Sequence, residues 1–200
     1  MSRAFLCLEL DDSTRLAVDA FVDTLREIPI RVAWTNAANL HVTLKFLGET
    51  DPARFATIAR SVKAVAQQFP TFDLNVSGTG AFPNWIAPRI LWVGAEDPTP
   101  TLHTLAEALE PTLAASGFPE ELRPYKPHIT IGRVHEAYSL QFLQRKLKLA
   151  PDFGLMTVRW LTLMRSDPYP SGSRYSVIAR LALASTSSPK LPTNGNFSAP

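Results

Sequence analysis

A four-residue pattern that occurs twice is the feature that most constrains this chain. Residues 41–44 read His-Val-Thr-Leu, and residues 128–131 read His-Ile-Thr-Ile. Both copies stand in stretches with strand character, and side chains two apart in a strand point to the same face. Each copy therefore presents an imidazole and a hydroxyl on one face and two aliphatic side chains on the other. The chain is constrained to bury both aliphatic faces while leaving both polar faces accessible.

These two polar faces are suited to acid–base chemistry at a phosphate ester. Histidine has an ordinary pKa of about 6.5, so both of its protonation states are accessible at neutral pH. In a pair, one imidazole takes a proton from the attacking water or hydroxyl, and the other gives a proton to the departing oxygen. We therefore predict His41 and His128 as a catalytic pair, with the hydroxyls of Thr43 and Thr130 binding phosphate oxygens. The sequence leaves open which histidine is the acid.

Three further side chains near the motifs are candidates for the same site. Lys45 shares the face of His41 by strand alternation, so we expect it to reach a bound phosphate. Arg133 has the opposite parity to His128, and it can contribute only if the strand twists, bulges or ends near Gly132. His135 follows the second motif closely enough to line the site.

Two other interpretations of the motifs have to be weighed. A single His-x-Thr is common, and a lone histidine in a strand is more often structural than catalytic. Two copies in similar strand contexts make a shared function the better interpretation. Histidine is also a common metal ligand, but neither copy is accompanied by His-x-His, His-Glu-x-x-His or a carboxylate cluster. We therefore predict no metal and no other cofactor.

Alternating helical and strand patterns predict the α+β class. Helices are expected up to residue 28 after a cap at 11–13, and over 52–69, 99–116 and 140–149, with Pro111 kinking or dividing the third. Strands are expected over 4–10, 32–34, 41–47, 72–82, 90–93, 153–164 and 175–184, besides the second motif strand. Short links between neighbouring strands favour antiparallel sheets, and the repeated motif suggests two similar lobes that face each other.

Length and composition place the chain among ordinary globular proteins. Its 200 residues, 46% of them hydrophobic, are enough for one domain, which we place at 1–184 as two pseudo-symmetric lobes. Residues 185–200 are rich in Ser, Pro, Thr and Asn, and we expect a disordered tail there. The net charge of +2 is too small for a protein that wraps duplex nucleic acid.

Location and assembly are predicted from what the sequence lacks. No apolar run is long enough for a membrane helix, and the N-terminus has no signal-peptide pattern. The single cysteine, Cys7, cannot form an internal disulfide, which agrees with a reducing compartment. No heptad pattern demands a dimer. We therefore expect a cytoplasmic monomer without membrane contact.

The motifs and their surroundings resemble the 2H phosphoesterases, in particular the RNA 2′,3′-cyclic phosphodiesterase branch, also called 2′-5′ RNA ligase. The resemblance rests on His-Val-Thr-Leu-Lys-Phe-Leu-Gly at 41–48 and Pro-His-Ile-Thr-Ile-Gly-Arg at 127–133. Supporting matches are found at 5–10, 39–40, 80–83, 88–94, 163–166 and 172–175, so the resemblance covers about residues 3 to 184. Ile131 stands where leucine is common, which is a conservative change.

The resemblance implies a bilobal α+β fold with two antiparallel sheets around a central cleft and helices outside. It implies that His41 and His128 are catalytic, that Thr43 and Thr130 bind phosphate, and that Arg133 contacts it. Family members open 2′,3′-cyclic phosphates at RNA ends to 2′-phosphates without a cofactor, and some join RNA ends by 2′-5′ ligation without ATP. By the same analogy His41 protonates the leaving 3′-oxygen while His128 activates water.

The sequence leaves other substrates and roles open. Cyclic phosphates of small nucleotides, or 2′-5′-linked oligonucleotides, require the same chemistry. A non-catalytic module that binds RNA ends would use the same face, although intact His and Thr in both copies argue against it. In each case we expect the partner to be an RNA end or a nucleotide carrying a cyclic phosphate.

Overall fold

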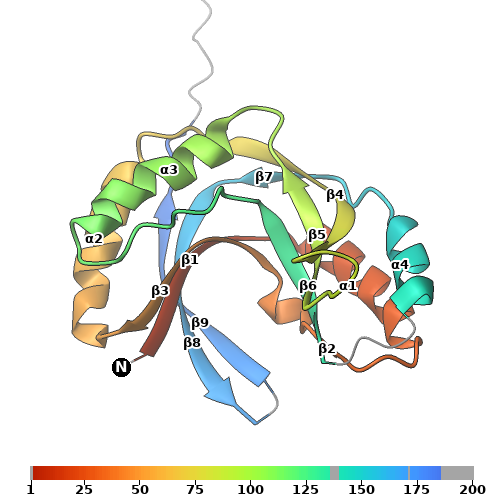
Figure 1. Ribbon diagram of the computed structural model, residues 1–200. Helices are drawn as coiled ribbons and strands as arrows, with labels where there is room; N and C mark the ends of the chain where they lie inside the picture. Colours follow the sequence, from red (N-terminus) through yellow and green to blue (C-terminus); the bar gives the residue numbers. More distant parts are fainter. Residues whose placement is uncertain (1, 136–139, 171, 186–200) are drawn as a thin grey trace, which may run out of the picture.

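One curled antiparallel sheet forms the centre of the molecule, and the helices lie on its outer side (Figure 1). The computed structural model describes residues 2–135, 140–170 and 172–185. Along the sheet the strand order is β7-β4-β5-β6-β3-β1-β8-β9, with β2 paired to β6. The strands are β1 (Ser2–Glu9), β2 (Val32–Trp34), β3 (His41–Thr50), β4 (Phe72–Phe82), β5 (Ile90–Glu96), β6 (His128–Val134), β7 (Leu155–Val158), β8 (Trp160–Tyr169) and β9 (Gly172–Ala182). The expected α+β class with antiparallel pairing is confirmed.

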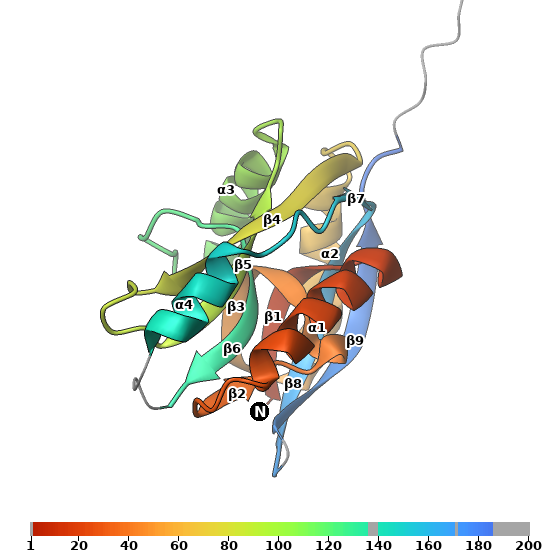
Figure 2. The same cartoon turned by 90° about the vertical axis from the view of Figure 1, so that its right-hand side faces the viewer.

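The helices cover the two halves of the sheet separately. Helices α2 and α3 lie outside the half that contains β3, β1, β8 and β9, and α1 and α4 lie outside the other half (Figures 1 and 2). The helices are α1 (Asp12–Arg26), α2 (Phe55–Ala66), α3 (Thr101–Ala114) and α4 (Leu140–Lys148), with short 3-10 turns η1 (Ala37–Asn39) and η2 (Pro52–Arg54).

Local sequence signals explain where the helices begin and which faces they bury. The Asp11 carboxylate accepts a hydrogen bond from the Thr14 amide at 2.8 Å, which caps the first turn of α1. Val18, Val22 and Leu25 follow at helical spacing, and all three are buried against the sheet. The side chains on the opposite face of α1 are mostly exposed, as an amphipathic helix on the outside of a sheet requires.

The two motif strands meet at the seam between the halves. β3 and β6 run antiparallel and are paired at Val42 and Ile129, the aliphatic residues that follow the two histidines. Both side chains are fully buried. The two expected sheets are therefore joined into one nine-stranded sheet, because the backbones of the motif strands pair with each other where their aliphatic faces share one core. This pairing sets both histidines on the same face of the sheet.

One expected strand is divided, and the helix that Pro111 was expected to kink or divide is not divided. The apolar stretch 153–164 is divided at Arg159 into β7 and β8, which pair with β4 and β1 in opposite halves of the sheet. Pro111 lies inside an uninterrupted α3. Leu109 and Leu113 on either side of it are 1% exposed, so burial of this helix face offsets the lost backbone hydrogen bond.

The expected tail lies outside the described residues apart from Ser185. None of the helices in the described part of the chain combines the length and the apolar character needed to cross a bilayer.

The seam gives a stability prediction. Replacing Ile129 by Ala removes buried methyl groups at the junction of the two halves, so the free energy of unfolding should fall by about 2–5 kcal/mol. Ile86 is the matched control, because its side chain is 90% exposed and Ile86→Ala should change stability by no more than about 0.5 kcal/mol. Urea denaturation measures both, and equal losses in the two variants would contradict the packing described for the seam.

Candidate active site

Both motif histidines are held by the same local geometry. The Nδ1–H of His41 donates to the carbonyl oxygen of Asn39 at 2.7 Å, and the Nδ1–H of His128 donates to that of Lys126 at 2.7 Å. In each case the acceptor lies two residues upstream, just before the strand begins. These bonds orient the two rings and assign the proton of the neutral imidazole to Nδ1, so Nε2 is the atom that exchanges protons with a substrate.

Aromatic side chains from other strands of the sheet fix the planes of the two rings. The imidazole of His41 packs against Phe5 with ring centroids 4.8 Å apart, and against the edge of Tyr175 at 5.4 Å. The imidazole of His128 meets Phe82 edge-on at 4.9 Å. Each histidine therefore has a phenylalanine beside it, and the two halves of the sheet provide matching supports.

Burial lowers the pKa of both histidines. For His41 the main cause is burial, which disfavours the imidazolium, and the positive charge of His128 lowers its pKa further. For His128 the main cause is also burial, and in both residues the bond to a backbone carbonyl partly opposes it. The two side chains are thus close enough to interact electrostatically, and burial disposes both toward the neutral form.

The two threonines lie on the same face as the histidines. The Thr43 hydroxyl is 3.0 Å from Nε2 of His41 and donates to it when the ring carries its proton on Nδ1. Thr130 stands opposite Trp92 of β5 and is half-buried, as Thr43 is. Both hydroxyls can therefore turn toward a ligand bound between the imidazoles.

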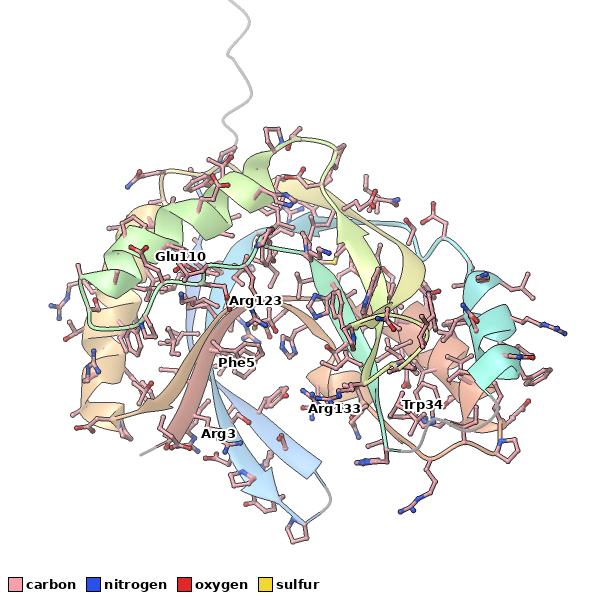
Figure 3. All side chains as sticks on the ribbon, viewed as in Figure 1. Arg3, Phe5, Trp34, Glu110, Arg123 and Arg133 are labelled. Atoms are coloured by element: carbon pink, nitrogen blue, oxygen red, sulfur yellow. The ribbon has the colours of Figure 1, made fainter. Side chains whose placement is uncertain are left out.

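A β-bulge brings Arg133 to the face that carries the second motif. Thr130 is paired with Trp92 and Arg133 with Ile90, so Ile131 is an extra residue in β6. Because their partners are two apart on β5, Thr130 and Arg133 face the same way. Figure 3 shows Arg133 extending from β6 toward the inside of the curl. Its charge also acts on the Tyr175 hydroxyl, which comes from the other half of the sheet.

The expectation that Lys45 faces a bound phosphate is wrong, and a second bulge explains why. Thr43 is paired with Cys7 and Lys45 with Leu6, so Leu44 is an extra residue in β3. Cys7 and Leu6 are adjacent on β1, which puts Lys45 on the opposite face from Thr43. Its ammonium group is 7% exposed and donates to Glu110 of α3 at 2.5 Å. The lysine therefore points to the helical side of the sheet.

The two bulges occur at the same position of the motif but present different side chains. Phe46, 69% exposed, takes the place in the first copy that Arg133 takes in the second. At the preceding position, a Cβ on Gly132 would come within 2.7 Å of Val32 and 2.9 Å of Trp34, so only glycine is accommodated there. The site is thus built from two similar halves and takes its arginine from one of them.

His135 is not brought to the other candidates. It lies seven residues beyond His128, which in an extended strand corresponds to about 23 Å. The residue is exposed, and its backbone amide donates to the carbonyl oxygen of Arg31 beside the end of β6. β6 begins at His128 and ends at Val134, so its extended backbone keeps the side chains of His128 and His135 apart.

A cavity of about 500 Å³ opens beside His41 on the inner face of the sheet. Leu40, Met164 and Tyr175 provide apolar surface in its lining, and Arg180 provides a guanidinium group. Arg180 donates two hydrogen bonds, of 2.7 and 2.9 Å, to the Glu9 carboxylate and thereby lowers its pKa. The lining of the cavity therefore combines apolar side chains with the Glu9–Arg180 ion pair.

The donor atoms at this site are imidazoles, hydroxyls and a guanidinium group. In the part of the chain that the structure describes, no three His, Cys, Asp or Glu side chains lie close enough together to hold a metal ion.

Sequence reasoning missed the groups that hold the histidines in place. Phe5, Phe82 and Tyr175 belong to strands other than the motif strands, and the acceptors Asn39 and Lys126 act through backbone atoms. The alternation of side chains in β1 and β4 indicates which face each phenylalanine occupies. Only the register of these strands with the motif strands shows that the two phenylalanines meet the imidazoles.

Comparison with known proteins places this geometry in a family. A model of the 2′-5′ RNA ligase superfamily matches residues 15–170. The RNA 2′,3′-cyclic phosphodiesterase of Methanothermobacter thermautotrophicus is 32% identical over 176 residues, which are 87% of this chain and 95% of that protein. The protein of the same name from Archaeoglobus fulgidus is 33% identical over 174 residues, covering 86% of this chain and 96% of that one.

A solved structure gives the same result for the fold. Escherichia coli LigT complexed with 3′-AMP superposes with a TM-score of 0.74 at 28% identity, covering 91% of this chain and 98% of that chain. Two motif strands with their histidines on one face of a curled sheet define a two-histidine phosphoesterase fold. The chain belongs to the 2′-5′ RNA ligase superfamily.

The lowered histidine pKa values predict how stability depends on pH. As pH falls below about 6.5, the unfolded chain binds protons at His41 and His128 before the folded protein does, so the free energy of unfolding decreases until the folded pKa values are passed. Replacing both residues by Gln should make this decrease shallower. Urea denaturation at a series of pH values measures it, and an unchanged slope in the double variant would contradict the assignment.

Proposed function

We propose that this chain is an RNA 2′,3′-cyclic phosphodiesterase, which hydrolyses a terminal cyclic phosphate to a 2′-phosphate. One observation carries the proposal: two imidazoles, oriented by matching Nδ1–H bonds, lie on paired strands and face the same side of the sheet. The relatives that carry this name support the choice of substrate.

The proposed reaction uses the two histidines in opposite roles. His128 takes a proton from water as its oxygen attacks phosphorus, and His41 gives a proton to the 3′-oxygen as the bond between it and phosphorus breaks. A protonated His41 is required, whereas burial favours its neutral form. The negative charge of the bound phosphodiester offsets this effect, because an anion beside an imidazole raises its pKa. Binding of the substrate thus prepares the acid.

The same groups join two RNA ends when the 5′-hydroxyl of a second RNA replaces water as the nucleophile, the 3′-oxygen remaining the leaving group. His128 then deprotonates the 5′-hydroxyl of a second RNA, and the product is a 2′-5′ linkage formed without ATP. Thr43, Thr130 and Arg133 stabilise the charge on the non-bridging oxygens in both reactions. The guanidinium is suited to this task, since its planar donors match phosphate oxygens in pairs.

An RNA end is favoured over a free cyclic nucleotide by the cavity beside His41. Its volume of about 500 Å³ provides room for a nucleoside next to the phosphate, with Met164 and Tyr175 as apolar surface. The guanidinium of Arg180, which is paired with Glu9, also lines this cavity, where a neighbouring phosphate of the RNA would meet it.

The proposal extends to the state and location of the protein. We take it to be a monomeric, cytoplasmic enzyme, which is supported by the buried, unpaired thiol of Cys7. Size-exclusion chromatography coupled to light scattering measures the mass of the protein in solution and so tests the monomeric state.

Histidine variants test the reaction directly. With an oligoribonucleotide that ends in a 2′,3′-cyclic phosphate, in the presence of a chelator, His41→Ala and His128→Ala should each lower kcat by about 100- to 10,000-fold. His135→Ala is the matched control and should retain wild-type kcat, because that residue lies at the far end of β6. The product is identified as 2′- or 3′-phosphate by phosphorus NMR.

Three results of this experiment would contradict the proposal. Binding without turnover by the wild-type protein would favour a module that only binds RNA ends. Activity lost on chelation would indicate a metal-dependent enzyme. Faster turnover of cyclic mononucleotides than of the oligonucleotide would favour the small-nucleotide substrate.

Arg133 gives a second test of the site. Arg133→Gln removes the cation that the bulge at Ile131 directs to the inner face, so kcat should fall by about 100-fold or more. Arg60, exposed on the outer helix α2, is the control, and Arg60→Gln should leave kcat unchanged. If Arg133→Gln kept wild-type kcat, the bulge would have no part in catalysis.

A further inference from the structure

The segment that leads into β6 is held by side chains rather than by backbone pairing. Residues 119–127 connect the end of α3 to His128, and they form neither helix nor strand. They make no backbone–backbone hydrogen bond with any other residue that the structure describes. We call residues 119–127 the crossing segment, since they run from the helical side of one half to the first residue of β6 in the other (Figure 1).

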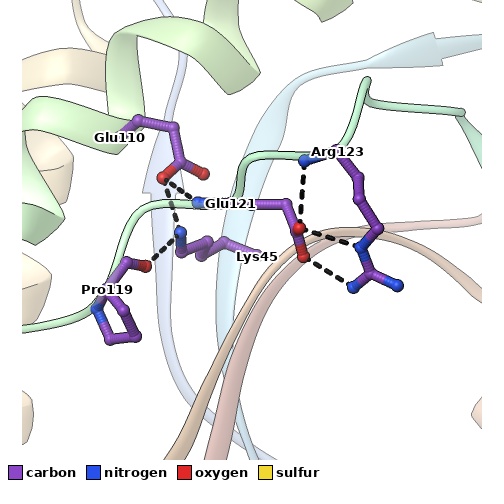
Figure 4. A network of polar contacts seen from close by, with 5 residues as sticks. All are labelled: Lys45, Glu110, Pro119, Glu121 and Arg123. Carbon is purple, nitrogen blue, oxygen red and sulfur yellow. Dashed lines mark hydrogen bonds and ion pairs between the residues drawn. The ribbon is translucent and has the colours of Figure 1, made fainter.

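Lys45 fixes the beginning of the crossing segment. Its ammonium group donates to the carbonyl oxygen of Pro119 at 2.8 Å and to the carboxylate of Glu110 at 2.5 Å. The same carboxylate oxygen accepts the backbone N–H of Glu121 at 3.1 Å. Figure 4 shows this arrangement, in which one buried ion pair binds two points of the crossing segment. The bulge at Leu44 is what turns Lys45 toward it.

Tyr125 fixes the end of the crossing segment. Its hydroxyl donates to the backbone carbonyl oxygen of Thr43 at 3.0 Å, and its ring meets the edge of His103 at a centroid distance of 5.6 Å. Burial raises the pKa of this hydroxyl, so it remains a donor over the whole range in which histidines titrate. The next residue, Lys126, provides the carbonyl that orients His128.

These contacts form a continuous connection from the first motif to the second. Lys45 and Thr43 belong to the strand of His41, and the crossing segment that they hold ends at the acceptor of the His128 ring. Direct pairing of β3 with β6 is limited to Val42 and Ile129. The crossing segment is thus a second connection between the two imidazoles, beside the strand pairing.

We propose that Lys45 and Tyr125 are positioning residues, which hold the crossing segment so that His128 faces the same phosphorus atom as His41. The inference rests on the proposed function for its catalytic consequence. A misplacement of about 1 Å in a reacting group lowers turnover by about 100-fold. Loosening the crossing segment therefore lowers kcat more than it changes KM.

The test compares variants that remove one contact each. Lys45→Met keeps the aliphatic stem and removes the ammonium, and Tyr125→Phe removes only the hydroxyl. Each should lower kcat on the cyclic-phosphate oligonucleotide by about 10- to 100-fold, with KM nearly unchanged. Lys45→Arg should restore most of the loss. Leu122→Ala is the control on the same segment, because the Leu122 side chain is 91% exposed, and this variant should keep wild-type kcat.

Imidazole NMR of the uncomplexed protein provides a readout that does not require activity. In Tyr125→Phe the resonances of His128 should broaden and its pKa should move toward its ordinary value, while those of His41 stay as in the wild type. If the protein shows no phosphodiesterase activity, the proposed function is rejected. The NMR measurement still decides whether Tyr125 positions His128.

The inference is overturned by any of three results. These are wild-type kcat in both Lys45→Met and Tyr125→Phe, a loss in Lys45→Met that Lys45→Arg does not restore, and unchanged His128 resonances in Tyr125→Phe. Thermal unfolding is recorded for every variant. If Lys45→Met fails to fold, Tyr125→Phe alone decides, since a single hydroxyl is removed from a side chain whose ring stays in place.

Discussion

The two β-bulges, one after each His-x-Thr, determine which side chains reach the inner face of the sheet. Without them strict alternation would place Lys45 beside Thr43 and turn Arg133 away from Thr130. The extra residues Leu44 and Ile131 reverse both outcomes. The arginine joins the histidines, and the lysine enters the helical side, where it finds a carboxylate and a carbonyl. The chemistry of the inner face and the attachment of the crossing segment both follow from this irregularity in the backbone.

Repetition of the motif gives the site its symmetry, and the residues after the motif break it. Each histidine is oriented by a carbonyl two residues upstream and packed against a phenylalanine, so the two halves provide equivalent imidazoles. Beyond the bulge one copy provides Phe46 and the other Arg133. We propose that these halves form one phosphate site, with Arg133 from one of them and a cavity for a nucleoside beside His41. Because the halves are unequal, the two histidines have different surroundings, which suits one to act as the acid and the other as the base.

Much of the fold and of the candidate site could be predicted from the sequence, because the strongest signals were local. Alternation and caps predicted the α+β class and the strands of both motifs, and the parity of Arg133 required a twist, a bulge or a strand end near Gly132 if this residue was to contribute. Lys45 was assigned to the wrong face, since a bulge leaves no mark in the pattern of residues 41–47. The division of 153–164 at Arg159 was missed because both pieces are apolar and alternate. Contacts such as Tyr125 with Thr43 depend on tertiary register, which a single sequence does not contain.

The central claim is that the two imidazoles address one phosphorus atom, and a crystal structure with a nucleoside 2′-phosphate tests it most directly. The account predicts Nε2 of His41 and Nε2 of His128 each within about 2.6–3.2 Å of an oxygen of the same phosphate, or joined to it by one water. Thr43, Thr130 and Arg133 should contact its remaining oxygens. A phosphate bound by only one of the two histidines, with the other ring turned away, would contradict the account.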